Sequence, residues 1–257
     1  MWFHNTHKDF AGHLQDLRIF LIIAIIFYIL CFGVCFYFAG FIYEFLANSF
    51  LQTLNHYKAG SNFITTAVPE LFFTYLKISF FTSLIIFVPV FLTLLFLYLL
   101  PALKKVEKKI AIILLILIPS LFALGIFSAY YVSLQVIWQF FISFNTNKHV
   151  QIIPKVNEYI SLVLSILFAF GISFELPIFM IILFLVNILN PQDIIKYSRY
   201  AVVLAFVIGA ILTPPDPLSQ ILMASVLLIL YFLSYFIILF ISRIIKNSVE
   251  TPPIVKE

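Results

Sequence analysis

Charged residues are scarce in this sequence. Lys, Arg, Asp and Glu make up 10% of its 257 residues, and hydrophobic residues make up 63%. A typical soluble domain has about 25% charged residues, so this composition excludes that class. With a mean hydropathy of +1.13, the chain is expected to be an integral membrane protein with no soluble domain between its apolar segments.

Cysteine is almost absent. The two cysteines, Cys31 and Cys35, lie one helical turn apart, so they share a helix face and cannot form a disulfide framework. No His or carboxylate lies beside them to complete a zinc site. They are predicted to be small apolar side chains in a lipid-embedded helix, and we predict no metal and no cofactor.

Catalytic and repeat motifs are also missing. The sequence contains no Gly-rich phosphate loop, no HExxH and no nucleophile-elbow pattern, so we predict that the protein is not an enzyme. No repeat of 20 to 50 residues relates parts of the chain. That absence weighs against a transporter built from inverted repeats.

Long apolar segments are what the sequence does contain, and a helix needs about 20 such residues to cross a membrane. Continuous hydrophobicity favours helices over a barrel, because backbone groups in lipid must be paired within each segment. The first segment is predicted to be a retained helix and not a removable signal. The sequence thus predicts one all-α membrane domain over residues 1–257, with six spans at 19–42, 78–100, 110–132, 159–189, 200–212 and 218–241.

The fifth predicted span is unusually short. It has 13 residues and reaches only about 20 Å, less than an ordinary hydrocarbon core of about 30 Å. Arg199 precedes it, and "TPPDP", with Asp216 between prolines, follows it and must turn. Either a carboxylate lies below the usual membrane surface or the bilayer is thinner there.

Basic residues are distributed unevenly between the two sides that six spans define. An even number of spans places both termini on one side, and 11 of the 15 Lys and Arg lie there: Lys8, Arg18, Lys104, Lys105, Lys108, Lys109, Lys196, Arg199, Arg243, Lys246 and Lys256. Lys58, Lys77, Lys148 and Lys155 lie on the other side. Both termini are therefore predicted to be inside, and the net charge of +4 reflects topology and not nucleic-acid binding.

Two segments outside the spans are predicted to be amphipathic helices. Residues before the first span show helical spacing of apolar side chains and are expected to form an interfacial helix that runs into it. "LANSFLQTLNHY", in the first outside loop, predicts a short surface helix that buries Phe50, Leu51 and Leu54. Pro89 and Pro119, within the second and third spans, are expected to kink them.

Glu175 is the charged residue that most needs a reason, because it lies within the apolar run "ILFAFGISFELPIFMIILFLV". A carboxylate in hydrocarbon costs on the order of 2.5–3.5 kcal/mol, so such a residue is by default a functional hypothesis. The structural alternative is a protonated carboxyl that forms a hydrogen bond across helices. Pro177 follows two residues later and frees a carbonyl that can line a polar site.

Two further carboxylates, on the inside, have either a structural or a functional interpretation. Asp16, in "HLQDLR", can stabilise the positive end of the first helix. Glu107, in "PALKKVEKK", can pair with Lys104 or Lys108 at the surface, which contributes little.

Four segments of the chain, in order, resemble the TatC family, the polytopic receptor subunit of the twin-arginine protein translocase. They are "HLQDLR" before span one, "PALKKVEKK" after span two, "YISLVLSILFAFGISFELPI" in span four and "RYAVVLAFVIGAILTPPDPLSQ" through span five. The match extends from about Phe10 to about Tyr235. The resemblance implies a concave, glove-shaped bundle of six helices, with helices five and six short.

The resemblance also implies a function and its residues. A TatC-type subunit binds twin-arginine signal peptides of folded proteins and, with single-span TatA/TatB-type partners, transports them using the proton-motive force. The implied positions are Leu14, Asp16, Arg18, Tyr98 and Glu107 for the signal peptide; Glu175, Pro177 and Gln220 for partner contact; and Pro101, Pro214, Pro215 and Asp216 in functional loops. Independently of the family, a carboxylate can bind the planar fork of a guanidinium through two hydrogen bonds, which an ammonium cannot match.

Several positions depart from the family pattern. Asp16 replaces the usual Glu and is shorter by one methylene; Ser49 and Gln135 replace prolines; Tyr98 replaces Phe; and Lys108 replaces Arg. These departures leave the architecture intact but bear on the affinity for a full twin-arginine motif.

Both the membrane of origin and the class of protein have alternatives. The 32 Phe and 13 Tyr suggest an AT-rich gene and a homologue in the mitochondrial inner membrane, with a bacterial inner membrane or a thylakoid as alternatives. Glu175 would also suit a proton-coupled small-solute carrier, and a membrane subunit of a respiratory complex is a third class. The resemblance predicts self-association in a multi-subunit complex and no nucleic-acid partner.

Overall fold

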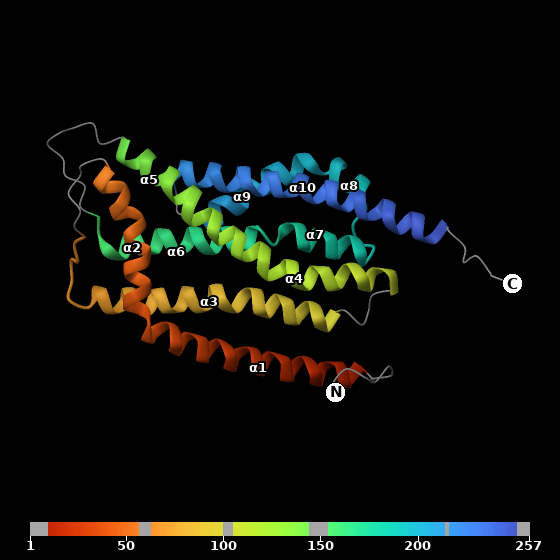
Figure 1. The fold of residues 1–257 in the computed structure, drawn as a ribbon, viewed down its shortest axis with the longest axis horizontal. Coiled ribbons are helices and arrows are strands. Elements are labelled where there is room, and N and C mark those ends of the chain that lie inside the picture. The colour runs from red at the N-terminus through yellow and green to blue at the C-terminus, as the bar shows by residue number, and fades with distance from the viewer. Residues whose placement is uncertain (1–9, 57–62, 100–104, 144–153, 214–215, 251–257) are drawn as a thin grey trace.

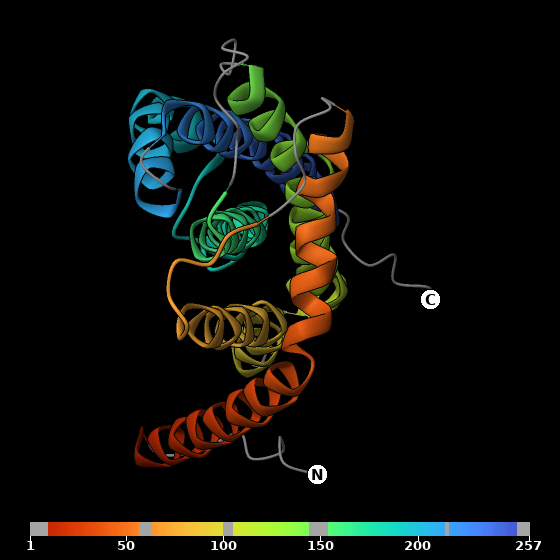
Figure 2. The ribbon, with the colours of Figure 1, turned by 90° about the vertical axis from the view of Figure 1, so that its left-hand side faces the viewer.

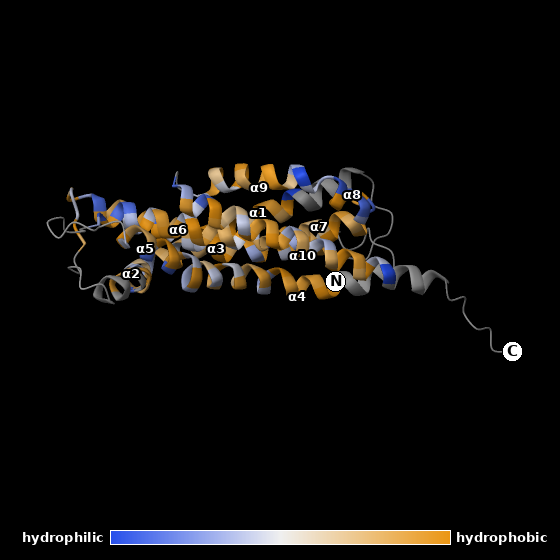
Figure 3. Ribbon diagram, turned by 90° about the horizontal axis from the view of Figure 1, so that it is seen from above, coloured by the Kyte–Doolittle hydropathy of each residue, from blue (hydrophilic) through white to orange (hydrophobic). Residues whose placement is uncertain are grey.

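The structure is a computed structural model that describes residues 10–56, 63–99, 105–143, 154–213 and 216–250. Its long helices run side by side, and helix α2 stands across one end of them (Figure 1). Hydrophobic residues dominate the middle of the long helices, and hydrophilic residues gather toward both ends (Figure 3). This is the pattern expected of a bundle that spans a membrane.

Within the described residues, five helical segments are long and apolar enough to cross a membrane: Arg18–Tyr37, Glu70–Leu97, Ile112–Ser143, Val156–Leu185 and Pro217–Arg243. The apolar helix Ser198–Leu212 is shorter. Its 15 residues extend about 22 Å. The all-α class and the short fifth helix are thus as predicted.

The first predicted span is wrong at its outer end. Helix α1 covers Phe10–Tyr37, and a separate helix, α2, covers Ala39–His56. The predicted span extended to Ile42 because Phe41 and Ile42 are as apolar as the residues before them. Hydropathy therefore does not indicate where α1 ends and α2 begins. The short amphipathic helix predicted for the outside loop is therefore the second half of α2.

Helix α2 is held against the outer ends of the other helices by two tyrosines. The hydroxyl of Tyr159 donates a hydrogen bond to the carbonyl of Leu46 at 2.7 Å, and that of Tyr130 donates to the carbonyl of Phe45 at 3.0 Å. The Phe50 ring lies 4.9 Å from the Trp138 ring, measured between centroids. Phe50 is buried and Leu51 half-buried, as predicted, whereas the side chain of Leu54 lies outside the described part.

The helix of the second span, α3 (Glu70–Leu99), begins further out than predicted. The helical segment of the third span extends beyond both of its predicted ends. The third consists of α4 (Lys105–Ser128), a π-helical turn, η2 (Ala129–Ser133), and α5 (Leu134–Ser143). Pro89 and Pro119 both lie inside helices that continue past them. The kinks expected at these prolines stay a prediction.

The fourth span is central to the bundle. It consists of α6 (Val156–Ser173) and α7 (Leu176–Leu185), separated at Phe174 and Glu175. In its most apolar stretch 61% of the residues are buried, against 11 to 28% in the other four spans. The span, predicted over 159–189, begins at Val156 and ends at Leu185.

The last three helices are α8 (Pro191–Lys196), α9 (Ser198–Leu212) and α10 (Pro217–Glu250). The expectation that the sixth span is short is wrong, because α10 has 34 residues. It continues through "SRIIKNSVE", where Arg243, Lys246 and Glu250 lie beyond the predicted apolar span. The Tyr231 hydroxyl joins α10 to α8 by donating to the carbonyl of Ile194 at 2.6 Å.

Seen along the long helices, α1, α3, α6 and the α9–α10 pair follow one another in a curved row (Figure 2). Helices α2 and α4 stand along one side of this row. Helix α4 packs on α3, α6 and α7, and α10 packs on α7, α8 and α9. This curved row, with α2 and α4 along one side, agrees with the expected glove-shaped bundle.

We predict that Tyr159→Phe lowers the thermal stability of the purified protein, because the buried carbonyl of Leu46 loses a donor. The expected cost is about 1–2 kcal/mol, measured as a lower unfolding temperature in detergent. Tyr37→Phe is the matched control, since Tyr37 is 83% exposed. Equal stability of the two variants would contradict the proposed role of Tyr159 in holding α2.

Candidate functional site

The candidate site is centred on Glu175, at the interruption between α6 and α7. Its side chain is 8% exposed, and its Oε1 atom has no hydrogen-bond partner among the described residues. Glu175 precedes the end of α7 by ten residues, or about 15 Å, which is half of a hydrocarbon core of about 30 Å. A buried carboxyl with a free oxygen therefore lies near the middle of the membrane.

Pro177 explains why the helix is interrupted at this position. It lies in the first turn of α7 and is buried, and it has no N–H to donate to the carbonyl four residues earlier, that of Ser173. The Ser173 hydroxyl donates to the carbonyl of Ala169 at 2.8 Å and lies 3.8 Å from the sulfur of Met223 on α10. Glu175 is thus part of a locally polar stretch of backbone where α6, α7 and α10 meet.

Two glycines allow α4 to approach this interruption closely. A Cβ atom on Gly125 would lie 2.7 Å from the carbonyl oxygen of Phe170 and 3.0 Å from the Cβ of Phe174. A Cβ on Gly171 would lie 2.8 Å from the ring of Phe122. Small residues at such crossings let helices pack tightly in lipid, so the position of Glu175 depends on glycines in two spans.

The first turn of α10 contains the other predicted partner-contact residue, Gln220. The side-chain amide of Gln220, half-buried, donates to the carbonyl of Phe206 at 3.2 Å. Asp216 caps α10, because its Oδ1 accepts from the backbone N–H of Ser219 at 2.8 Å. Pro214 and Pro215 lie outside the described residues. Gln220 therefore faces α9, whereas Met223, three residues later on α10, faces Ser173 beside the α6–α7 interruption.

The predicted signal-peptide residues that the structure describes lie on α1, α3 and α4, near the helix ends opposite α2. Asp16 lies in the second turn of α1 and Glu107 in the first turn of α4, and both helices begin at the right-hand end of Figure 1. Arg18 is exposed. The side chains of Leu14, Asp16, Tyr98 and Glu107, and all of Pro101, lie outside the described part, so their contacts stay a prediction.

Basic side chains are found at that same end. Lys196 and Arg199 flank the start of α9, and both are exposed. Each lies over the ring of the tyrosine that follows it, at 5.4 Å for Lys196 and 4.9 Å for Arg199, a favourable cation–π distance. This agrees with the assignment of the end as the inside.

The geometry defines a multi-pass, all-helical integral membrane protein whose central span holds a buried carboxyl at a helix interruption. The sequence model of "Sec-independent protein translocase protein (TatC)" matches residues 12–225. The chain belongs to the TatC family, as the four sequence segments predicted.

Relatives and solved structures agree with this assignment. The Sec-independent protein translocase protein TatC of Rickettsia prowazekii (strain Madrid E) is 38% identical over 251 residues, which cover 95% of this chain and 94% of the relative. The TatC of Escherichia coli (strain K12) is 36% identical over 212 residues, covering 82% and 81%. A crystal structure of the twin-arginine translocase receptor TatC has a TM-score of 0.77 at 37% identity, covering 89% of this chain and 98% of that one.

Sequence reasoning did not find Gly125 and Gly171. The available signal was one small residue in each of two spans, which becomes informative only when the spans are known to cross. Sequence reasoning also identified no partner for Lys77, which forms two hydrogen bonds with α6.

We predict that Gly125→Ala impairs the protein, because the added methyl group would overlap the Phe170 carbonyl and displace Glu175. Overpacking of this kind costs about 1–3 kcal/mol. The expected result is a lower unfolding temperature in detergent together with reduced protein export in cells. Gly33→Ala is the control, since no atom lies within 4 Å of a Cβ placed there; if both variants behave like the parent, the close crossing is not important.

Proposed function

We propose that this chain is the receptor and core subunit of a twin-arginine translocase, which binds twin-arginine signal peptides and transports folded proteins with the proton-motive force. The observation that carries the proposal is Glu175: a membrane-embedded carboxyl, 8% exposed, with one oxygen free of partners among the described residues. A carboxyl group is costly in lipid, so its presence there indicates that it has a function.

Signal-peptide recognition is assigned to the inner end of the bundle. Asp16 and Glu107 are on helices that begin at this end, and each carboxylate can take one guanidinium through two hydrogen bonds. Leu14, Arg18 and Tyr98 would surround the bound peptide, and Pro101 would shape the loop before α4. Asp16 is shorter than Glu, so its contact requires a closer approach of the peptide.

Partner helices are assigned to the membrane-embedded site. The free oxygen of Glu175 and the side chain of Gln220 would bind a polar group on a TatA/TatB-type single-span helix or on the inserted signal peptide. Pro177 supports this role by leaving the carbonyl of Ser173 without a helical donor beside Glu175, and Asp216 does so by capping α10; Pro214 and Pro215 are proposed to contribute to the same functional loop. Self-association of the receptor in a larger complex completes the proposed assembly.

The membrane in question is proposed to be an energised inner membrane. The relatives reported above are bacterial proteins, which supports a bacterial inner membrane. The phenylalanine-rich and tyrosine-rich composition is the reason to retain the mitochondrial inner membrane as the other proposal. The family membership favours translocation over a small-solute carrier or a respiratory subunit.

Substitutions of Glu175 test the membrane-embedded site. Glu175→Gln keeps the size and hydrogen-bonding capacity and is expected to retain export, whereas Glu175→Ala removes the polar group and Glu175→Arg inserts a cation that costs on the order of 2.5–3.5 kcal/mol. Export of a twin-arginine reporter is measured in cells that lack their own TatC. Glu158→Ala, on the same span but with a 73% exposed side chain, is the control. Full export by Glu175→Arg would refute the proposal.

Photocrosslinking tests the inner-end site. Probes placed at residues that neighbour Asp16 and Glu107, so that both carboxylates remain in the full-length protein, are expected to label a twin-arginine signal peptide and to label a twin-lysine peptide much less, because the bidentate geometry is lost. A probe at exposed Phe41, on α2 at the opposite end, is the negative control. Equal labelling by both peptides would contradict the role assigned to Asp16 and Glu107.

A further inference from the structure

Lys77 is a half-buried cation inside the apolar part of α3. The apolar stretch Glu70–Leu97 has 28 residues and is about 42 Å long, so it exceeds a core of about 30 Å by about 6 Å at each end. Lys77 follows Glu70 by seven residues, or about 10 Å. Its Cα therefore lies just inside the outer border of the hydrocarbon, where a lysine side chain can extend to the level of the lipid phosphates.

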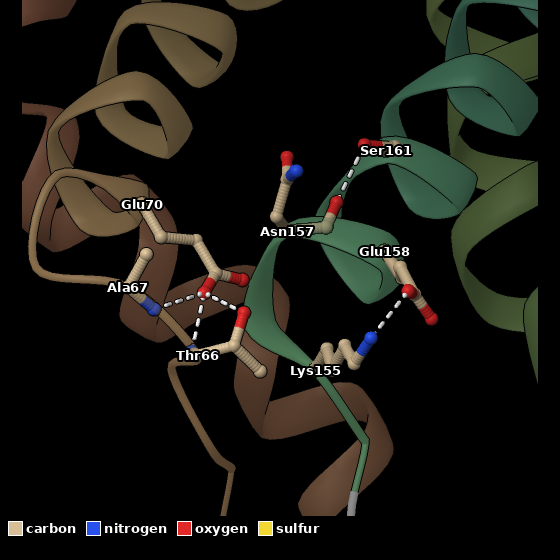
Figure 4. A network of polar contacts seen from close by, with 7 residues as sticks. All are labelled: Thr66, Ala67, Glu70, Lys155, Asn157, Glu158 and Ser161. Carbon is tan, nitrogen blue, oxygen red and sulfur yellow. Dashed lines mark hydrogen bonds and ion pairs between the residues drawn. The ribbon is translucent and has the colours of Figure 1, made fainter.

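The ammonium group of Lys77 is held in place by two neutral oxygens of α6. It donates to Asn157 Oδ1 and to Ser161 Oγ, both at 2.7 Å. Ser161 in turn donates its hydroxyl to the carbonyl of Asn157, as Figure 4 shows, so both lone-pair acceptors are oriented toward the lysine. An ammonium has three N–H donors, and one of them has no acceptor within the described residues.

Lys77 has no carboxylate partner in the part of the chain that the structure describes. Glu70, two turns away on α3, uses its Oε2 to accept from the backbone N–H groups of Thr66 and Ala67 and from the Thr66 hydroxyl (Figure 4). Glu158 pairs with Lys155 at 3.3 Å. Neither carboxylate forms an ion pair with Lys77 among the described residues, so the third N–H donor of Lys77 can bind an anion from outside this chain.

The surface below Lys77 is apolar and suits an acyl chain. Phe81 is one turn below Lys77 on α3, and Phe168 is two turns below Ser161 on α6. Their rings meet edge to face at 6.1 Å, and both are half-buried. A cation with a free donor thus stands above an aromatic seam between α3 and α6, which is the arrangement that a phospholipid matches with its phosphate and one acyl chain.

We propose that Lys77, with Asn157 and Ser161, forms a binding site for the phosphate group of an outer-leaflet phospholipid, whose acyl chain lies along the Phe81–Phe168 seam. The site is separate from Glu175 and from the inner-end carboxylates. The lipid phosphate accepts the third N–H of Lys77 and fastens the outer end of the α3–α6 pair to the membrane. Its existence does not depend on the proposed translocase function.

Native mass spectrometry of the purified full-length protein, with added phosphatidylglycerol and no partner subunits, tests the site. Lys77→Gln is expected to weaken lipid binding about fivefold, the effect of one basic residue at an anionic membrane surface. Asn157→Asp is expected to weaken it as well, because a carboxylate placed beside Nζ replaces the lipid anion while preserving the contact between α3 and α6. Lys155→Gln, which removes an exposed lysine that already has a partner, should bind lipid like the parent.

Several results would overturn the proposal. Lys77→Gln or Asn157→Asp with parental lipid binding would show that the third donor does not hold a lipid, and would favour an acidic group on a partner helix instead. Displacement of the lipid by inorganic phosphate at equal concentration would show a plain anion site without an acyl-chain contribution. Lys77→Arg, which retains the charge, is expected to keep binding lipid, and loss of binding in this variant would also count against the site.

Discussion

The close crossing of α4 over the interruption between α6 and α7 is the constraint on which the rest of the structure depends. Lipid offers no hydrogen bonds, so irregular backbone is tolerated at membrane depth only where protein covers it. Gly125 lets α4 cover the Phe170 carbonyl from one side, and α10 covers the same region through Met223. Because this covering holds, the fourth span can afford both a proline and a carboxyl in its middle.

The number and type of spans follow from hydropathy, because the cost of placing polar groups in lipid is large and acts on every residue of a span. Their ends do not. The division between α1 and α2 falls at Phe38, within an uninterrupted apolar run, and α10 continues past Ile241 to Glu250, through a segment that contains charged residues. The boundary at Phe38 is accompanied by packing of α2 on Tyr130 and Tyr159, which are far away in the chain.

The candidate site was predicted unevenly for the same reason. Glu175 stands out by itself, since one charge in an apolar run is conspicuous, whereas Asp16 and Glu107 were selected only by resemblance to a family. The partners of Lys77 are 80 and 84 residues away, and the contacts of Gly125 are in another span. No local pattern encodes such contacts, so they appear only when the helices are assembled.

The two tyrosine hydroxyls that hold α2 across the outer helix ends make the two halves of the molecule mechanically unequal. Because α2 links the helices at the outer end, they resist separation there. Small tilts of the individual helices therefore produce their largest displacements at the inner end. Movements that admit an incoming polypeptide are accordingly expected to open from the inner surface and to diminish with depth. The outer surface would then stay closed to small ions while a segment is accommodated from within.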